Sequence, residues 1–272
     1  MNDTGTEPAA AGFESEGAWV EAGRGWGARA AEWAYLFEPY ARPANDLLFD
    51  RLGVGDGTGL LDIACGSGLA ANTANRRGAS VTGIDASGAL IDIARARTPE
   101  GDFRVGDMFA LPFDRSFDVV TSFNGIWNGN EAALAEAKRM LGDGGRLGLT
   151  FWGAPEHIGL VPYFAKLYEL SPPSHQSATM EQAQTSQVIE AMLAATGLEV
   201  LEHGTVEVVN EWPDSETAVR ALAAAGPSVP AIESVGYDAF CRELHGVVEP
   251  MRHPRTGVRI SSELGWVTAR AA

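Results

Sequence analysis

The chain has 272 residues, 45% of them hydrophobic and 21% charged, which excludes an overall disordered or coiled-coil protein and favours an ordinary folded one. Acidic residues outnumber basic residues by 36 to 20, giving a net charge of −16. This surplus argues against nucleic-acid and anionic-membrane partners, because both are polyanions that require clustered Lys and Arg.

The first segment, residues 1–16, is acidic and rich in Gly, Ala and Pro, which predicts a mobile tail. It has neither the basic start nor the apolar centre of a signal peptide, and nowhere does the chain reach the roughly 18 to 20 apolar residues of a membrane helix. The two cysteines, Cys65 and Cys241, are interpreted as reduced thiols. Together these features predict a soluble, cytoplasmic protein.

Residues 17–57 are predicted to form an N-terminal helical cap. A helical pattern from Gly17 to Phe37 places Trp19, Trp26 and Trp33 seven residues apart on one face, for which a core role is favoured over ligand contact. Three glycines between them disfavour one unbroken helix. A second helix is expected at about residues 43–52.

Strands and helices then alternate, which predicts βαβ units and a parallel sheet covered on both faces. Strands are expected at 59–64, 80–85, 102–105, 117–122 and 146–152, and helices at 69–77, 87–97 and 130–141. A turn at 142–145 is expected before the fifth strand.

The remaining segment is less regular. We expect a helix at 156–170 interrupted at Pro162, a helix at 185–196, a strand at 198–212, helices at 215–225 and 231–248, and a final strand at 258–268. The total is seven strands, and the fold class is α/β.

The strongest motif is the run from Asp62 to Gly68, Asp-Ile-Ala-Cys-Gly-Ser-Gly, where a predicted strand ends in a glycine turn. Glycine lets the backbone approach a ligand closely, and α/β folds bind ligands at the carboxyl ends of their strands. Asp85 ends the next strand, where a carboxylate can accept hydrogen bonds from a ribose. The same spacing satisfies the dinucleotide fingerprint, so an NAD(P)-dependent oxidoreductase remains an alternative.

Three features favour a different nucleoside ligand. Asp62 precedes Gly66 by four residues and suits a cationic amino group rather than a pyrophosphate. Asp107 and Met108 follow the third strand, where a carboxylate and a thioether could hold an adenine. The third is the Leu-Pro-Phe-Asp segment from Leu111, which leads into Phe-Asp-Val-Val at the fourth strand.

In order and spacing, these segments and Leu141-x-x-Gly-Gly-x-Leu resemble the class I S-adenosylmethionine-dependent methyltransferases, most closely the small-molecule enzymes common in bacteria. The resemblance covers about residues 60–152. It implies a doubly wound, Rossmann-like sheet of seven strands in the order 3-2-1-4-5-7-6 with the last strand antiparallel. It also implies a core over residues 58–272, with lid insertions at about 153–185 and 212–256 that select the acceptor.

The resemblance further implies S-adenosylmethionine as cofactor, with S-adenosylhomocysteine as product, and a set of cofactor-binding residues. Ala64, Gly66 and Gly68 would lie along the methionine moiety, with Asp62 near its amino group. Asp85 would bind the ribose, and Ala86, Asp107 and Met108 would hold the adenine. Asn124 would lie near the sulfonium. Ala64 stands where the family most often has glycine.

The acceptor side is predicted from fewer signals. Trp127 and Trp152 could stack on a flat or apolar small molecule, and His157 is the best placed candidate for a general base. No metal-ligand spacing is present, so no metal is expected. The basic residues Arg95 and Arg97 are interpreted as cations that complement the end of a helix.

Other hypotheses remain open beside methyl transfer. A methyltransferase-like fold could bind S-adenosylmethionine without turnover. An oxidoreductase would need Tyr-x-x-x-Lys, whereas Tyr163 and Lys166 are one residue too close. Protein or nucleic-acid acceptors are the alternative within the family, and a homodimer built on the lid segments is the expected assembly.

Overall fold

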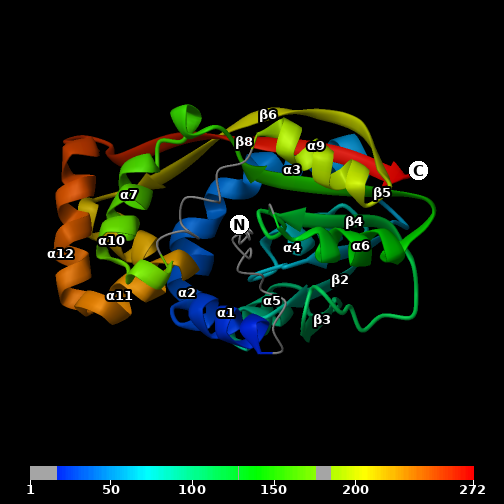
Figure 1. The fold of residues 1–272 in the computed structure, drawn as a ribbon, viewed down its shortest axis with the longest axis horizontal. Helices are drawn as coiled ribbons and strands as arrows, with labels where there is room; N and C mark the ends of the chain where they lie inside the picture. Colours follow the sequence, from blue (N-terminus) through cyan, green and yellow to red (C-terminus); the bar gives the residue numbers. More distant parts are fainter. Residues whose placement is uncertain (1–16, 128, 176–184) are drawn as a thin grey trace, which may run out of the picture.

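The computed structural model describes residues 17–127, 129–175 and 185–272, so the predicted mobile tail at 1–16 lies outside the described residues. Its centre is a mixed sheet in the order β3-β2-β1-β4-β5-β8-β6 (Figure 1). The first five strands are parallel: β1 (Gly59–Ile63), β2 (Ser80–Asp85), β3 (Asp102–Val105), β4 (Phe117–Phe123) and β5 (Leu141–Trp152).

The last long strand reverses direction. β8 (Gly257–Ala271) lies between β5 and β6 (Leu198–Trp212) and is antiparallel to both. The expected order and the antiparallel strand are thus confirmed. A two-residue strand that the sequence did not predict, β7 (Arg252–His253), pairs with the start of β8.

Helices cover both faces of the sheet because alternate strand residues point to opposite sides. Leu60 belongs to the apolar core shared with α3 (Arg42–Leu52), α4 (Leu69–Arg76) and α5 (Gly88–Arg97). Its neighbour Leu61 belongs to the core shared with α6 (Glu131–Met140) and α9 (Ser186–Ala195). The local signals are ordinary ones: Ser87, for example, caps α5 by accepting a hydrogen bond from the backbone N–H of Leu90.

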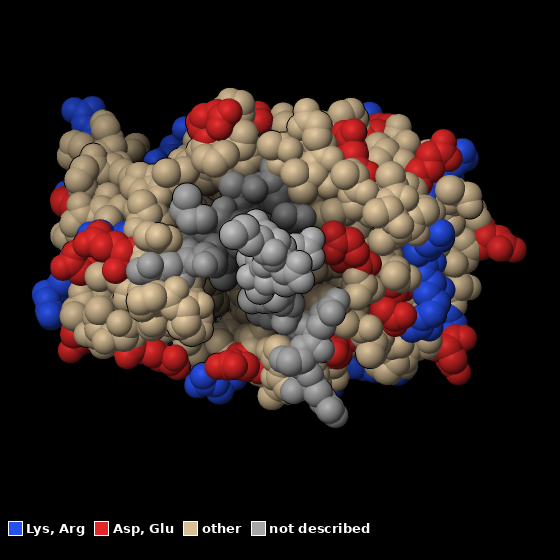
Figure 2. All heavy atoms as spheres, viewed as in Figure 1, with Lys and Arg blue, Asp and Glu red and all other residues tan. Residues whose placement is uncertain are grey.

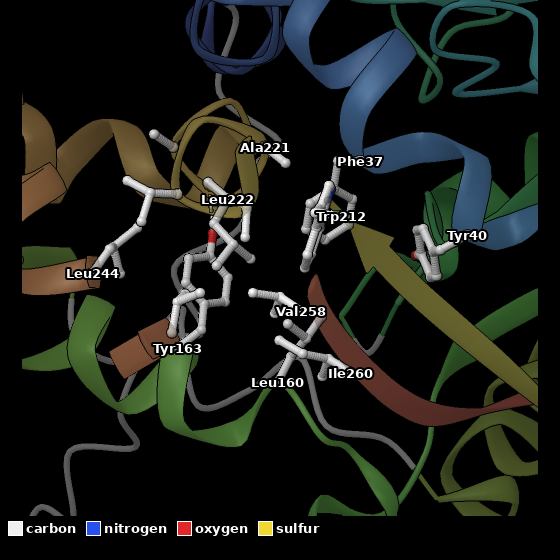
Figure 3. Packing of buried hydrophobic residues seen from close by; sticks show 14 of the residues in the cluster. Phe37, Tyr40, Leu160, Tyr163, Trp212, Ala221, Leu222, Leu244, Val258 and Ile260 are labelled. Carbon is white, nitrogen blue, oxygen red and sulfur yellow. Dashed lines mark hydrogen bonds between the residues drawn. The ribbon is translucent and has the colours of Figure 1, made fainter. Parts of the chain in front are cut away.

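A third core lies beyond the sheet. The helical lobe consists of α7 (Val161–Leu170), α10 (Ser215–Ala223), α11 (Val229–Val235) and α12 (Tyr237–Val248), gathered at one end of the molecule (Figure 1). Figure 3 shows its centre, where Tyr163, Leu222 and Leu244 from three of these helices pack together with residues of β8. Phe37, from the N-terminal segment, packs in the same cluster beside Trp212.

The N-terminal segment joins the lobe to the sheet. It consists of α1 (Ala18–Gly27), α2 (Ala30–Glu32), a π-helical turn at Trp33–Phe37 and a 3-10 turn at Glu38–Ala41. The expected break in the helical pattern is therefore confirmed. α1 packs against α5 on the sheet side and against the turn Gly226–Ser228 (η4) on the lobe side.

Several predicted boundaries were wrong for local reasons. Pro162 does not interrupt a helix; it lies in the first turn of α7, where its missing N–H is harmless, and a separate short turn, Pro155–His157 (η3), precedes that helix. The predicted helix at 231–248 is divided by Gly236, whose φ of 83° is left-handed. The expected turn at 142–145 lies inside β5, which begins at Leu141 opposite Phe117. None of the described helices has the length and apolar character needed to cross a bilayer.

Candidate active site

A cavity of about 480 Å³ lies at the carboxyl ends of the parallel strands, enclosed by the N-terminal segment and the helical lobe. Nine of the residues predicted from sequence line this central cavity: Asp62, Ala64, Gly66, Asp85, Ala86, Met108, Asn124, Trp127 and Trp152. Gly68, Asp107 and His157 do not.

The glycine loop is shaped by left-handed backbone. Ala64, Gly66 and Gly68 have φ values of 56°, 55° and 73°. Alanine in this conformation is strained, which explains why glycine is the more usual residue at position 64. A Cβ on Gly68 would lie 2.8 Å from the Cβ of Ala94, so this glycine permits close packing of α4 on α5 rather than ligand contact.

Two carboxyl groups define the polar end of the cavity, buried Asp62 and half-buried Asp85. Asp62 accepts a hydrogen bond of 2.8 Å from the Thr121 hydroxyl. Burial, reinforced by the nearby Asp85 and Glu38 carboxyl groups, raises the pKa of Asp62 to about 7. Asp85 accepts hydrogen bonds from the backbone N–H groups of Gly66 and Ser87, at 2.9 and 2.8 Å. It therefore links the glycine loop to the start of α5.

Of the two residues after β3 that were predicted to hold the adenine, one lines the cavity and the other does not. Met108 faces the cavity, whereas Asp107 accepts a 2.9 Å hydrogen bond from the backbone N–H of Phe109 and does not line it. The adenine contact of Asp107 stays a prediction.

Sequence reasoning missed Glu38, which reaches the site from the N-terminal segment. Its carboxylate accepts hydrogen bonds from the Ser67 hydroxyl and, at 2.8 Å, from the Arg97 guanidinium. Burial raises the pKa of Glu38, although Ser67 and Arg97 oppose that shift. One signal could have found it, because Glu38 is a lone carboxylate in the otherwise apolar run from Trp33 to Tyr40.

Arg97 lies in the last turn of α5, as predicted for a cation at a helix end, but complementing the helix end is not its only role. Its side chain is only 16% exposed, and it also donates to the carbonyl oxygens of Ala34 and Ser67, at 2.8 and 3.2 Å. Arg97 therefore fastens the N-terminal segment onto the glycine loop. By contrast, Arg95 pairs with Asp92 on the exposed side of α5.

The structure does not bring His157 to the cavity. Its ring is 58% exposed and lies 3.3 Å from Glu263 Oε1, on the surface. The turn Pro155–His157 carries it outward, so its position does not support the predicted role as general base. A different histidine, His175, lines the cavity from the segment after α7.

The other end of the cavity is aromatic. Five of the seven tryptophans line it: Trp19, Trp26, Trp33, Trp127 and Trp152. The core role favoured for the first three is therefore corrected for Trp19 and Trp26, which are half-buried and face the cavity. Trp33 lines the cavity too, but it also packs against the core of the helical lobe and stacks on Phe37, so a core role holds for it. The Tyr40 and Trp152 rings are stacked, 5.7 Å apart at an angle of 6°, and Phe164 meets Trp152 edge-on.

The arrangement fits the cofactor that the sequence implies. Glu38, Asp62 and Asp85 lie at the polar end of the cavity, and the guanidinium bound to Glu38, that of Arg97, is not among the lining residues. The other charged lining residues, Glu21, Arg24 and Glu233, are exposed and pair with one another. A ligand with cationic amino and sulfonium groups offsets this negative charge, whereas a pyrophosphate would be repelled. The residues present therefore suit S-adenosylmethionine better than a dinucleotide. Within the described residues, no cluster of three or more His, Cys, Asp or Glu side chains could hold a metal ion.

Comparison with known proteins agrees with this fit. A family model described as "Methyltransferase domain" matches residues 61–149. A demethylmenaquinone methyltransferase of Renibacterium salmoninarum is 38% identical over 112 residues, which cover 40% of this chain and 47% of the relative. Another, from Clavibacter sepedonicus, is 32% identical over 201 residues, 71% of this chain and 74% of the relative. The chain thus spans about half of the first relative and three quarters of the second.

Solved structures share the fold at lower identity. The 4+2 cyclase SpnF has a TM-score of 0.57 at 22% identity, covering 85% of this chain and 81% of its own. A TehB-like methyltransferase from Corynebacterium glutamicum has a TM-score of 0.51 at 17% identity, covering 90% and 99%. Fold, site and relatives together define an α/β nucleoside-binding protein of methyltransferase type. The chain belongs to the class I S-adenosylmethionine-dependent methyltransferases.

Proposed function

We propose that this protein transfers the methyl group of S-adenosylmethionine to a small molecule bound beside the cofactor. The observation that carries the proposal is one continuous cavity whose polar end holds Glu38, Asp62 and Asp85 and whose other end is walled by tryptophans. Asn124, at the end of β4, lines the same cavity. A cofactor and an acceptor can therefore lie side by side in one enclosed space.

The chain's own residues supply binding and alignment. Asp62 and Glu38 would hold the amino group of the cofactor, Asp85 the ribose, and Ala86 and Met108 the adenine. When bound, the cofactor supplies an electrophilic methyl group, whose transfer depends chiefly on alignment with the acceptor. The aromatic walls exclude water and orient an apolar partner.

A flat, largely apolar acceptor is the class that this cavity favours. Aromatic rings bind such molecules through large contact areas and specific stacking geometries. The relatives are named demethylmenaquinone methyltransferases, and we carry over from that name only the proposal of a quinone-like or phenolic ring. Acidic side chains are scattered over the face shown in Figure 2, which also suits a small acceptor better than a nucleic acid.

The segments outside the central sheet would act as a lid. The N-terminal cap at 17–57 contributes Trp26 and Tyr40 to the cavity wall, and the insertions at about 153–185 and 212–256 contribute Phe164 and Pro227. We propose that they select the acceptor, that copies of the chain pair through them as a homodimer, and that the protein acts in the cytoplasm.

Calorimetric titration with S-adenosylhomocysteine, with NAD and NADP run in parallel, tests the proposal. We expect micromolar binding of S-adenosylhomocysteine alone. Transfer of labelled methyl groups from S-adenosylmethionine to a panel of quinols and phenols then tests turnover. Binding of a nicotinamide cofactor instead, or of none of the three, would overturn the proposed function.

A further inference from the structure

The hydroxyl group of Tyr40 lies at the junction of the two ends of the cavity. Tyr40 is 7% exposed and lines the cavity from the 3-10 turn of the N-terminal segment. Its ring stacks on Trp152, which belongs to the aromatic end, and its hydroxyl bonds to Asn124, at the carboxyl end of β4. Tyr40 also belongs to the buried cluster of Figure 3, where it lies on the side of the N-terminal segment, away from Tyr163 and Leu244, and meets Phe37 edge-on.

A directional chain of hydrogen bonds fixes what this hydroxyl can do. The Thr150 hydroxyl donates to Oδ1 of Asn124 at 3.2 Å, so the amide nitrogen of Asn124 must face the other way. That nitrogen, Nδ2, donates to the Tyr40 oxygen at 2.9 Å. The backbone N–H of Asn124 bonds back to Thr150, and a left-handed φ of 55° holds Asn124 in this position.

Because the Tyr40 oxygen already accepts a hydrogen bond, its own proton is left to donate. Within the described part of the chain no atom accepts it. Burial and the nearby Glu38 carboxyl group raise the pKa of Tyr40 above its ordinary value, so the hydroxyl keeps its proton. A buried donor without an acceptor is costly, which points to a ligand atom as its partner.

The second tyrosine of the cavity shows the contrast. The Tyr163 hydroxyl lies 2.9 Å from the Ser228 oxygen and donates to the carbonyl of Leu222 at 3.2 Å. Its hydrogen-bonding capacity is used inside the lobe. Of these two cavity-lining tyrosines, Tyr40 is therefore the one that can mark an acceptor.

The charge around Tyr40 limits what it can bind. Glu38, Asp62 and Asp85 surround the polar end and disfavour an anionic ligand next to them. A neutral oxygen, as a carbonyl or a hydroxyl group, is then the suitable partner for a donor. The aromatic walls require that this oxygen be carried by a flat ring.

We infer that the Tyr40 hydroxyl binds the acceptor, by donating a hydrogen bond to a neutral oxygen on a flat aromatic ring. This inference rests on the proposed function and adds to it a specificity-determining residue together with the polar group that this residue recognises. Tyr40 orients the ring beside the cofactor, and Asn124 and Thr150 hold Tyr40 in place.

The test uses three probes of one carbon skeleton: 2-naphthol, naphthalene and decahydro-2-naphthol. Their binding to the full chain is measured by equilibrium dialysis at saturating S-adenosylhomocysteine. We expect 2-naphthol to bind about tenfold more tightly than naphthalene, the effect of one buried hydrogen bond, and more tightly than the puckered decahydro-2-naphthol. In Tyr40→Phe this preference over naphthalene should disappear, while affinity for S-adenosylhomocysteine changes by less than about threefold.

Tyr163→Phe is the matched control, because it removes the same atom from a second buried tyrosine of the same cavity. It should keep the preference for 2-naphthol. Equal binding of 2-naphthol and naphthalene to the wild type, or a preference that survives in Tyr40→Phe, would overturn the inference. Failure of the wild type to bind S-adenosylhomocysteine would instead overturn the proposed function, so the two failures are distinguishable.

Discussion

The two ends of the central cavity are built in different ways. The polar end comes mainly from the last residues of β1 and β2 and the loop after β1, so Asp62, Gly66 and Asp85 lie within 24 residues of one another in the chain. The aromatic end collects side chains from segments far apart in sequence, such as Trp26, Trp127 and Phe164. The local geometry of strand ends and the loops that follow them makes the polar end, and tertiary packing makes the aromatic end.

This difference separates binding of the cofactor from choice of the acceptor. Loops at the carboxyl ends of adjacent parallel strands are placed by the sheet itself. The aromatic wall depends on how the N-terminal segment and the helical lobe sit on that sheet. Substitutions at the polar end should therefore alter cofactor affinity directly. Substitutions where the N-terminal segment or the helical lobe meets the sheet should act by displacing the whole segment.

The largest effect is expected from Asp85→Ala. The change removes a half-buried carboxylate that organises Gly66 and Ser87 and that would bind the ribose. Loss of two charge-assisted hydrogen bonds should weaken S-adenosylhomocysteine binding by about 100-fold or more, measured by calorimetry. Asp107→Ala is the control, because this carboxylate lies outside the cavity; an equal or larger loss there would place the main nucleoside contact after β3 instead.

The next effect concerns the contact between α1 and the sheet. A Cβ on Gly23 would lie 2.1 Å from the carbonyl oxygen of Ala86, so Gly23→Ala must push α1 away from the predicted adenine site. We expect roughly tenfold weaker binding of S-adenosylhomocysteine, about 1.4 kcal/mol. Gly25→Ala is the matched control, because replacing either glycine with alanine favours the helix equally. A Cβ on Gly25 would meet only Val229 Cγ2, at 3.9 Å. Equal affinities of the two variants would show that α1 does not close on the cofactor.

The sequence predicted the polar end well for a physical reason. Strand periodicity, a glycine turn and a terminal carboxylate are all local signals, and they located Asp62, Gly66 and Asp85 in the cavity. Even the strain at Ala64 follows from a local departure from glycine. The sheet order came from the family resemblance, and the short strand β7 carried too few residues to be recognised.

The aromatic end could be predicted only in part. Trp127 and Trp152 follow β4 and end β5, so their place near the site could be inferred. Tyr40 and Glu38 could not, because their position depends on a π-helical turn and on Arg97, a contact 59 residues away from Glu38. His157 failed for the opposite reason: proximity to β5 in sequence did not determine the direction of its side chain.

A smaller effect is expected in the pH dependence of cofactor affinity, which Asp62 at the polar end should control. The pKa of Asp62 is raised to about 7 in the folded chain, so the folded state holds a proton that the unfolded state releases near pH 4. The contribution of Asp62 to the free energy of unfolding is fully present below pH 4, falls as the pH rises towards 7, and is lost above pH 7. A cationic ligand favours the ionised carboxylate, so affinity for S-adenosylhomocysteine should rise several-fold between pH 5.5 and 8.

Asp62→Asn provides the control for this titration. The amide keeps the shape of the side chain but cannot ionise, so most of the rise in affinity with pH should disappear in calorimetric titrations. Burial also raises the pKa values of Asp85 and Glu38, and these two groups account for any dependence that remains. A pH profile identical to that of the wild type would remove Asp62 from the contact with the amino group.

The smallest effect is expected at Ala64, where the comparison of the two ends predicts a purely local response. Glycine adopts the φ of 56° without the strain that alanine carries there, so Ala64→Gly should raise the free energy of unfolding by up to about 1 kcal/mol. Ala70→Gly, inside α4, should instead lower it by about the same amount. Denaturant titration of both variants measures these changes. If Ala64→Gly altered the preference between 2-naphthol and naphthalene, the glycine loop would help to choose the acceptor, and the separation between the two ends would fail.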